Sequence, residues 1–75
     1  MKLSEMLPAH RYTIVKMSAK PPLSYRLLSM GFSHGSSIEL LAMTLAKGTL
    51  DVCVNGVVIA LRKEEADLIF VEQCA

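Results

Sequence analysis

The chain has 75 residues, of which 52% are hydrophobic, 20% are charged and only 5% are aromatic. A chain of this size makes one domain, so we expect a single compact unit over residues 1–75 with a mainly aliphatic core. The formal net charge of +1 argues against a nucleic-acid-binding surface and against a polybasic membrane patch.

The amino terminus and the cysteines indicate the compartment. Residues 1–8 contain one lysine, an early glutamate and no continuous apolar run, so they do not read as a secretory signal. No stretch approaches the ~20 apolar residues that are needed to cross a bilayer. Cys53 falls in a predicted strand and Cys74 in a tail, which favours free thiols over a disulfide. We therefore expect a cytoplasmic protein.

A first strand is expected over residues 10–17. This stretch is rich in β-branched and aromatic residues, and Tyr12 and Ile14 alternate with polar neighbours. Val15 interrupts the alternation. Two prolines then end the strand and precede a helix.

A short helix is expected from about residue 23 to residue 30, because apolar side chains recur there at helical spacing. Gly31 stands where the C-terminal cap of a helix requires a positive φ. Phe32 can fold back onto the helix as the apolar contact that accompanies such a cap. Leu28 and Tyr25 fall on a flank of the apolar stripe, where at least one of them can be exposed.

A hairpin is the sharpest local signal in the second half of the chain. After a strand at residues 37–44, the dipeptide Asn55-Gly56 separates two apolar runs and is typical of a type I′ turn. This two-residue turn fixes the register and places six side chains on one face, which we expect to be core. The pairs are Val54 with Val57, Val52 with Ile59, and Leu50 with Leu61.

The last elements complete a mostly β fold. Residues 63–67 are expected to form one charged helical turn, and residues 68–72 a closing strand. We therefore expect a small, strongly bent β-barrel of about five strands with one short α-helix between the first two strands.

Two segments carry a resemblance to a known family. Residues 28–36 read Leu-Ser-Met-Gly-Phe-Ser-His-Gly-Ser, and residues 58–66 read Val-Ile-Ala-Leu-Arg-Lys-Glu-Glu-Ala. With the order of the elements, they closely resemble the ferrous iron transport protein A (FeoA) family over nearly the whole chain. The chain departs from the family at His34, where proline is common, and at residues 45–49, where the usual acidic residue is missing.

The resemblance implies an SH3-like β-barrel and a non-enzymatic, cytoplasmic role in ferrous iron uptake. The implied partner is FeoB, a membrane ferrous iron transporter with a GTP-binding domain, which a FeoA protein binds and modulates through protein–protein contacts. Two other classes stay open: a metal-responsive regulatory domain like the C-terminal barrels of iron-dependent repressors, and a small nucleic-acid-binding barrel. The balanced charge and few aromatic residues disfavour the second class.

The residues with metal-donor side chains do not form a recognisable motif. His10, His34, Cys53 and Cys74 do not have the spacing of zinc ligands. The sequence also lacks a Ser-His-Asp or Cys-His motif and a phosphate-binding loop. We therefore expect no resident metal, no cofactor and no enzymatic activity.

The partner-binding surface is expected at the end of the helix and in the turn after it. Its residues are Leu28, Gly31, Phe32, Ser33 and His34. An apolar patch with a polar rim is typical of a protein-binding surface. The alternative, that Phe32 is simply buried as the cap contact, stays open. We expect no insertion into a membrane, and a weak homo-oligomer also stays open.

Overall fold

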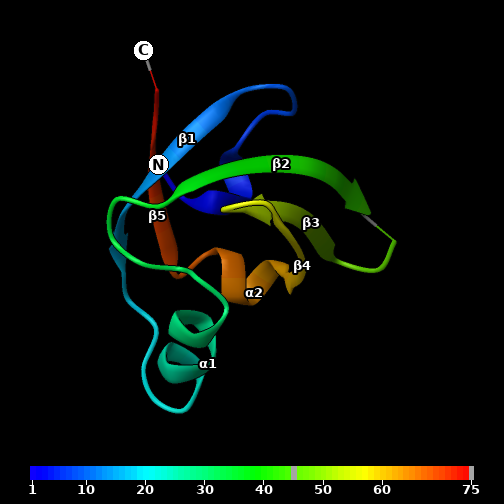
Figure 1. Ribbon diagram of the computed structural model, residues 1–75. Coiled ribbons are helices and arrows are strands. Elements are labelled where there is room, and N and C mark those ends of the chain that lie inside the picture. The colour runs from blue at the N-terminus through cyan, green and yellow to red at the C-terminus, as the bar shows by residue number, and fades with distance from the viewer. Residues whose placement is uncertain (45, 75) are drawn as a thin grey trace.

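Alternating apolar residues and tight glycine turns fold the chain into one antiparallel sheet (Figure 1). The computed structural model describes residues 1–44 and 46–74. Within these residues the elements are η1 (Leu3–Glu5), β1 (Arg11–Met17), α1 (Leu23–Ser29), β2 (Ser37–Thr44), β3 (Thr49–Val54), β4 (Val57–Arg62), α2 (Lys63–Ala66) and β5 (Ile69–Gln73). The strand order is β4-β3-β2-β1-β5. The mostly β class with α1 between the first two strands is confirmed.

The predicted boundaries agree with the observed ones to within about one residue. β1 starts at Arg11 rather than at residue 10, and β5 spans Ile69–Gln73 rather than residues 68–72. The short 3-10 helix η1 was not predicted. Leu45, the first residue of the loop expected at 45–49, lies outside the described residues. Of the helices in the described part of the chain, none is long and apolar enough to span a membrane.

Two bulges bend the sheet. The register of β1 with β5 shifts between Ile14 and Lys16, which places Val15 in a bulge and accounts for the broken alternation at that residue. The register of β2 with β3 shifts between Leu40 and Ala42. Figure 1 shows the resulting curvature of β2. Because bulges increase strand twist, the inner faces of the strands turn toward one another and enclose the core.

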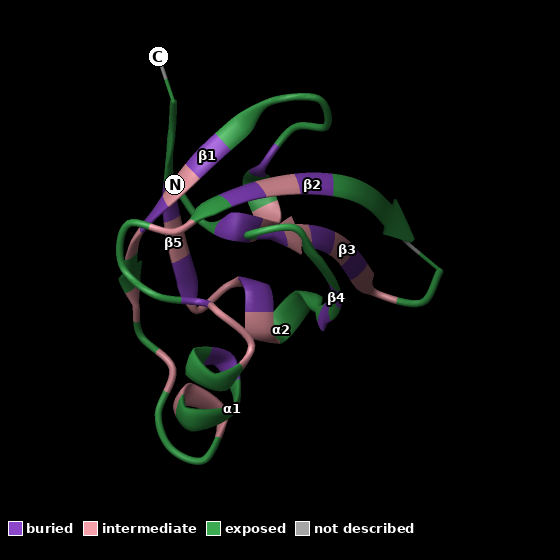
Figure 2. Cartoon of the chain, viewed as in Figure 1, coloured by how far each residue is buried: buried purple, intermediate pink, exposed green. Residues whose placement is uncertain are grey.

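The core is apolar and lies between the curved strands, α1 and η1 (Figure 2). Its buried residues are Leu3, Met6, Tyr12, Ile14, Leu27, Phe32, Ile38, Leu40, Leu50, Val52, Val54, Ile59, Leu61, Ala66, Ile69 and Val71. Tyr12 brings a polar atom into this region, and its hydroxyl accepts a hydrogen bond from the backbone N–H of Leu7 at 3.1 Å. This bond satisfies the phenol where burial would otherwise be unfavourable.

The β3–β4 hairpin has the predicted register. Val54 is opposite Val57, and the remaining pairs follow in order to Thr49 and Arg62. Asn55 has φ 50° and Gly56 has φ 84°, as a type I′ turn requires. The prediction that all six inner residues are core is wrong for Val57, which is 56% exposed. Val57 directly follows the turn, so its side chain lies beyond the end of the core.

The two edges of the sheet differ in whether other residues of the chain cover them. At the β5 edge, the N–H of Val71 donates to the carbonyl oxygen of Met1 at 2.8 Å, and the amino group of Met1 donates back to Val71 at 3.0 Å. Lys2 adds a bridge to Phe70. The amino-terminal residues therefore cover the β5 edge. At the other edge, β4 has β3 as its strand neighbour and no strand beyond it among the described residues.

Candidate partner-binding site

The C-terminal end of α1 is closed by a double backbone hydrogen bond. The N–H of Phe32 donates to the carbonyl oxygen of Leu27 at 3.0 Å, and the N–H of Gly31 donates to that of Leu28 at 3.1 Å. Gly31 has φ 97°, so the predicted glycine cap is confirmed. A side chain at Gly31 would meet Asn55 and Val54 only at ordinary contact distances of 3.6 and 3.8 Å. The backbone angle, not lack of space, therefore requires glycine here.

Phe32 is fully buried against the core. Its exposed fraction is 0%, the same as that of Leu27, which faces it across the cap. The prediction that the Phe32 side chain belongs to an exposed partner-binding surface is therefore wrong. The alternative, that Phe32 is the apolar contact of the helix cap, is right. Gly31 is half-buried, and its part in a partner-binding surface stays a prediction.

Leu28, the residue next to Leu27, points the other way. It is 53% exposed, and Tyr25, three residues earlier on the same side of the helix, is 68% exposed. Both residues of the predicted flank are thus accessible, and Tyr25 is the larger apolar surface of the two. Figure 2 shows that most of α1 is exposed and that burial is confined to the side facing the barrel.

The turn after the cap presents Ser33 and His34 on a fixed backbone. Both residues are exposed. The hydroxyl of Ser36 donates to the carbonyl oxygen of Gly31 at 3.1 Å and lies 2.9 Å from the hydroxyl of Ser33. The turn is also tied to β1, because the N–H of Gly35 donates to Ile14 at 2.7 Å. These bonds fix the backbone that carries the two exposed side chains.

An ion pair connects α1 to α2. The guanidinium group of Arg26 donates to the carboxylate of Glu65, whose other oxygen accepts the backbone N–H of Arg62 at 3.0 Å. Glu65 is 19% exposed, so this carboxylate is more shielded than a typical surface acid. The contact therefore ties α1 to α2 through Arg26. We call the exposed residues Tyr25, Leu28, Ser33 and His34 the α1-end surface.

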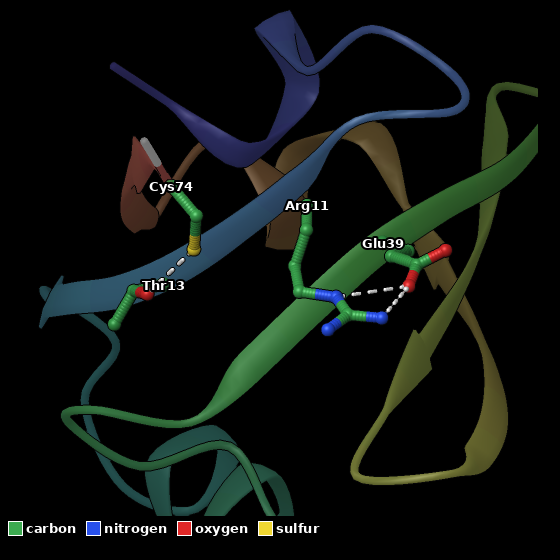
Figure 3. A network of polar contacts seen from close by, with 4 residues as sticks. All are labelled: Arg11, Thr13, Glu39 and Cys74. Carbon is green, nitrogen blue, oxygen red and sulfur yellow. Dashed lines mark hydrogen bonds and ion pairs between the residues drawn. The ribbon is translucent and has the colours of Figure 1, made fainter.

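Two of the four metal-donor side chains, His10 and Cys74, line one open cavity together with Arg11 and Glu39. Cys53 is opposite Glu39 on β3, and His34 lies in the turn after α1. Nδ1 of His10 lies 3.0 Å from the side-chain amide of Gln73, and Cys74 lies 3.2 Å from the hydroxyl of Thr13. Figure 3 shows the Cys74 contact beside the ion pair of Arg11 and Glu39, in which the charged atoms are 3.2 Å apart. Within residues 1–44 and 46–74, no group of three or more His, Cys, Asp or Glu side chains is placed to hold a metal ion.

One carboxyl group has a shifted pKa, and it lies away from the α1-end surface. The hydroxyl of Ser4 donates to Asp67, and Nζ of Lys63 is 3.3 Å from the other carboxylate oxygen. The Ser4 hydrogen bond is the main cause that lowers the pKa of Asp67, with a further contribution from Lys63. These contacts link η1 to α2, so the shift belongs to the framework of the fold.

Comparison with known sequences identifies relatives over the whole chain. The FeoA domain family matches residues 1–73. A Helicobacter pylori (strain J99) protein named as an Fe(2+) transport protein A is 32% identical over 76 residues, covering 100% of this chain and 97% of the relative. Its counterpart from H. pylori strain 26695 is 32% identical over 74 residues, covering 97% of each chain.

Solved structures show the same relationship. The FeoA protein from Chlorobium tepidum has a TM-score of 0.92 and 29% identity, covering 100% of this chain and 71% of that one. Iron(II) transport protein A from Clostridium thermocellum has a TM-score of 0.91 and 34% identity, covering 97% and 45%. A manganese-dependent transcriptional repressor has a TM-score of 0.91 at 24% identity, covering 99% and 36%, which shows a shared fold alone. The expected SH3-like barrel is thus confirmed.

Proposed function

Because this chain belongs to the FeoA domain family, which is involved in Fe(2+) transport, we propose that it is a non-enzymatic accessory protein that binds the cytoplasmic part of an FeoB-type ferrous iron transporter and modulates it. In this proposal the protein works in the cytoplasm and acts through protein–protein contacts. Its contribution is a shaped surface, and any GTP chemistry belongs to the partner.

The observation that carries the proposal is the exposure of Tyr25 and Leu28 beside a fixed turn. Two large apolar side chains on one flank of a helix, at 68% and 53% exposure, offer adjacent apolar area that a partner can cover. Ser33 and His34 supply a polar rim at the helix end. This combination is typical of the anchor and rim of a binding surface.

The fixed backbone supports the same proposal. The cap of α1 and the hydrogen bonds of Ser36 hold the turn in one conformation before any partner arrives. A preformed surface loses little conformational entropy on binding, so even a small patch can give measurable affinity.

A binding experiment tests the α1-end surface. Leu28→Glu places a charge in the centre of the patch, and the matched control is Leu7→Glu, because Leu7 is 59% exposed on a different part of the chain. With the purified cytoplasmic domain of an FeoB-type transporter, we expect Leu28→Glu to weaken binding at least tenfold, about 1.4 kcal/mol, and Leu7→Glu to change it little. Isothermal titration calorimetry measures both.

Thermal melts decide whether the variants can be compared. Both variants should melt like the wild type, since the substituted side chains are exposed. If a folded Leu28→Glu variant binds as tightly as the wild type, the α1-end surface is not the contact site. If the wild-type chain itself does not bind the transporter domain, the proposed function is refuted.

A further inference from the structure

The open edge of β4 is the second exposed feature of this fold. A two-residue hairpin makes Val54 and Val57 a hydrogen-bonded pair, and such pairs then alternate along the two strands. By this alternation, Ile59 and Leu61 direct their backbone groups toward β3. The backbone N–H and C=O groups of Val58 and Ala60 therefore point away from the sheet.

The residues beyond this short stretch are already engaged. The N–H of Arg62, which also points outward by the same alternation, donates to the carboxylate of Glu65 at 3.0 Å. Gly56 lies in the turn. The open part of the edge is thus limited to Val58 and Ala60, which lie symmetrically on either side of Ile59.

The side chains on this edge are apolar and accessible. Val57 and Val58 are 56% and 65% exposed, and Ala60 is exposed as well. Exposed, apolar edge strands are templates for pairing with another strand. The opposite edge of the same sheet is covered by Met1 and Lys2, so β4 is the edge that the described chain leaves uncovered.

We infer that β4 pairs with β4 of a second copy of this chain, antiparallel, with the two-fold axis at Ile59. In this register Val58 is opposite Ala60 of the other copy and Ala60 is opposite Val58, so each pair exchanges two backbone hydrogen bonds. All the outward groups of Val58 and Ala60 are satisfied at once. The open stretch is limited to the same two residues in each copy, so a second copy pairs all of it and leaves no outward group of Val58 or Ala60 unpaired.

Charge and space agree with this pairing. Arg62 is the single charged residue of β4, and in this register it is opposite Gly56 rather than another charge. The net charge of +1 gives little repulsion between two copies. An open cavity of about 400 Å³ lies between Arg26 of α1 with the C-cap residue Met30 and Thr49, Ala60 and Arg62 of the hairpin, so space remains between the helix and this end of β4.

The contact is separate from the α1-end surface. Around the helix, Arg26 and Leu28 are about 200° apart, so Arg26 faces the β4 side while Leu28 lies on the opposite flank. Self-pairing of β4 therefore does not depend on the proposed binding of a transporter, and either can fail without the other. The small number of new hydrogen bonds makes this a weak dimer.

Sedimentation equilibrium of the full chain tests the inference. We expect the weight-average mass to rise toward twice that of one chain as the concentration increases from about 10 μM to about 1 mM. Ala60→Pro removes one outward N–H without removing a bond to β3, so it should stay folded and monomeric over the same range. Val58→Lys is a second variant that adds charge to the edge, and Leu41→Lys is the matched control, because Leu41 is 49% exposed on β2.

Amide hydrogen exchange gives a direct readout that needs no substitution. The amides of Val58 and Ala60 should exchange more slowly at high than at low protein concentration, whereas that of Ile59, bonded to β3, should be protected throughout. A wild-type chain that stays monomeric at 1 mM overturns the inference. So does a dimer that persists in folded Ala60→Pro and Val58→Lys, because it must use another surface.

Discussion

The backbone N–H of Phe32 donates to the carbonyl oxygen of Leu27 at 3.0 Å, and both side chains are completely buried. This relationship joins the end of α1 to the core at the point where the chain leaves the helix. It also determines which neighbours remain available, because Leu28 turns outward as Leu27 turns in. The segment that resembles the FeoA family thus contains both fully buried and exposed apolar side chains.

Removal of the Phe32 side chain should unfold much of the protein. A Phe→Ala change in a core costs about 3–5 kcal/mol, a large fraction of the stability of a domain this small. Leu28→Ala should change stability by no more than about 0.5 kcal/mol, because Leu28 is exposed. Urea unfolding of the two variants measures the difference. Equal stability would mean that Phe32 does not pack in the core.

Substitution of Gly56 by a β-branched residue should destabilise the hairpin turn, whereas Asn55→Gly should not. No atom lies within 4 Å of a Cβ placed on Gly56, so the effect of Gly56→Val comes from its φ of 84°. A β-branched residue is strained in that conformation, and we expect a loss of more than about 1 kcal/mol. Asn55→Gly, in which glycine adopts the same positive φ freely, is the control and should melt close to the wild type. An unchanged melting temperature for Gly56→Val would contradict the turn assignment.

Glu65 should contribute more to folding stability than its ion-pair partner Arg26. Its carboxylate caps α2 by accepting the N–H of Arg62 and also binds Arg26. Glu65→Ala removes both contacts and should cost about 1–2 kcal/mol. Glu65→Gln keeps an oxygen for the cap and should cost less. Arg26→Ala, which removes only an ion pair whose arginine is 56% exposed, should cost under about 1 kcal/mol. Chemical denaturation at low salt ranks the three variants, and a larger effect for Arg26→Ala would contradict this order.

Stability should decrease at acid pH through Asp67. Its folded-state pKa is lowered below the ordinary value, mainly by the Ser4 hydroxyl. The folded protein therefore gains stability from the carboxylate above the unfolded pKa of about 3.9, and loses it as the pH falls through the lower folded pKa. Melting curves from pH 7 to pH 2 should show a gap between wild type and Asp67→Asn that closes in acid. In a Ser4→Ala background, the difference in melting temperature between Asp67 and Asp67→Asn at pH 7 should be smaller, because the main hydrogen bond to the carboxylate is missing. A gap that does not change with pH would show that Asp67 stabilises the fold by another route.

Local conformational rules account for what the sequence determined by itself. The Asn55-Gly56 turn fixes the β3–β4 register through its two positive φ angles, and the three predicted pairs are all observed. Gly31 ends α1 for the same kind of reason. These features depend on a few neighbouring residues, so the printed sequence is sufficient to predict them.

Only the tertiary structure decided which apolar residues are covered. Val57 shares the inner face with buried residues but extends past the core, while Phe32, in a turn between glycines, is buried. The β5 edge is covered through a contact between Met1 and Val71, which are 70 positions apart in the chain. Burial and edge pairing depend on where distant segments meet once the sheet has curled. Periodicity within one segment carries no information about that meeting, so the burial of Phe32 and the open β4 edge became visible only in the folded chain.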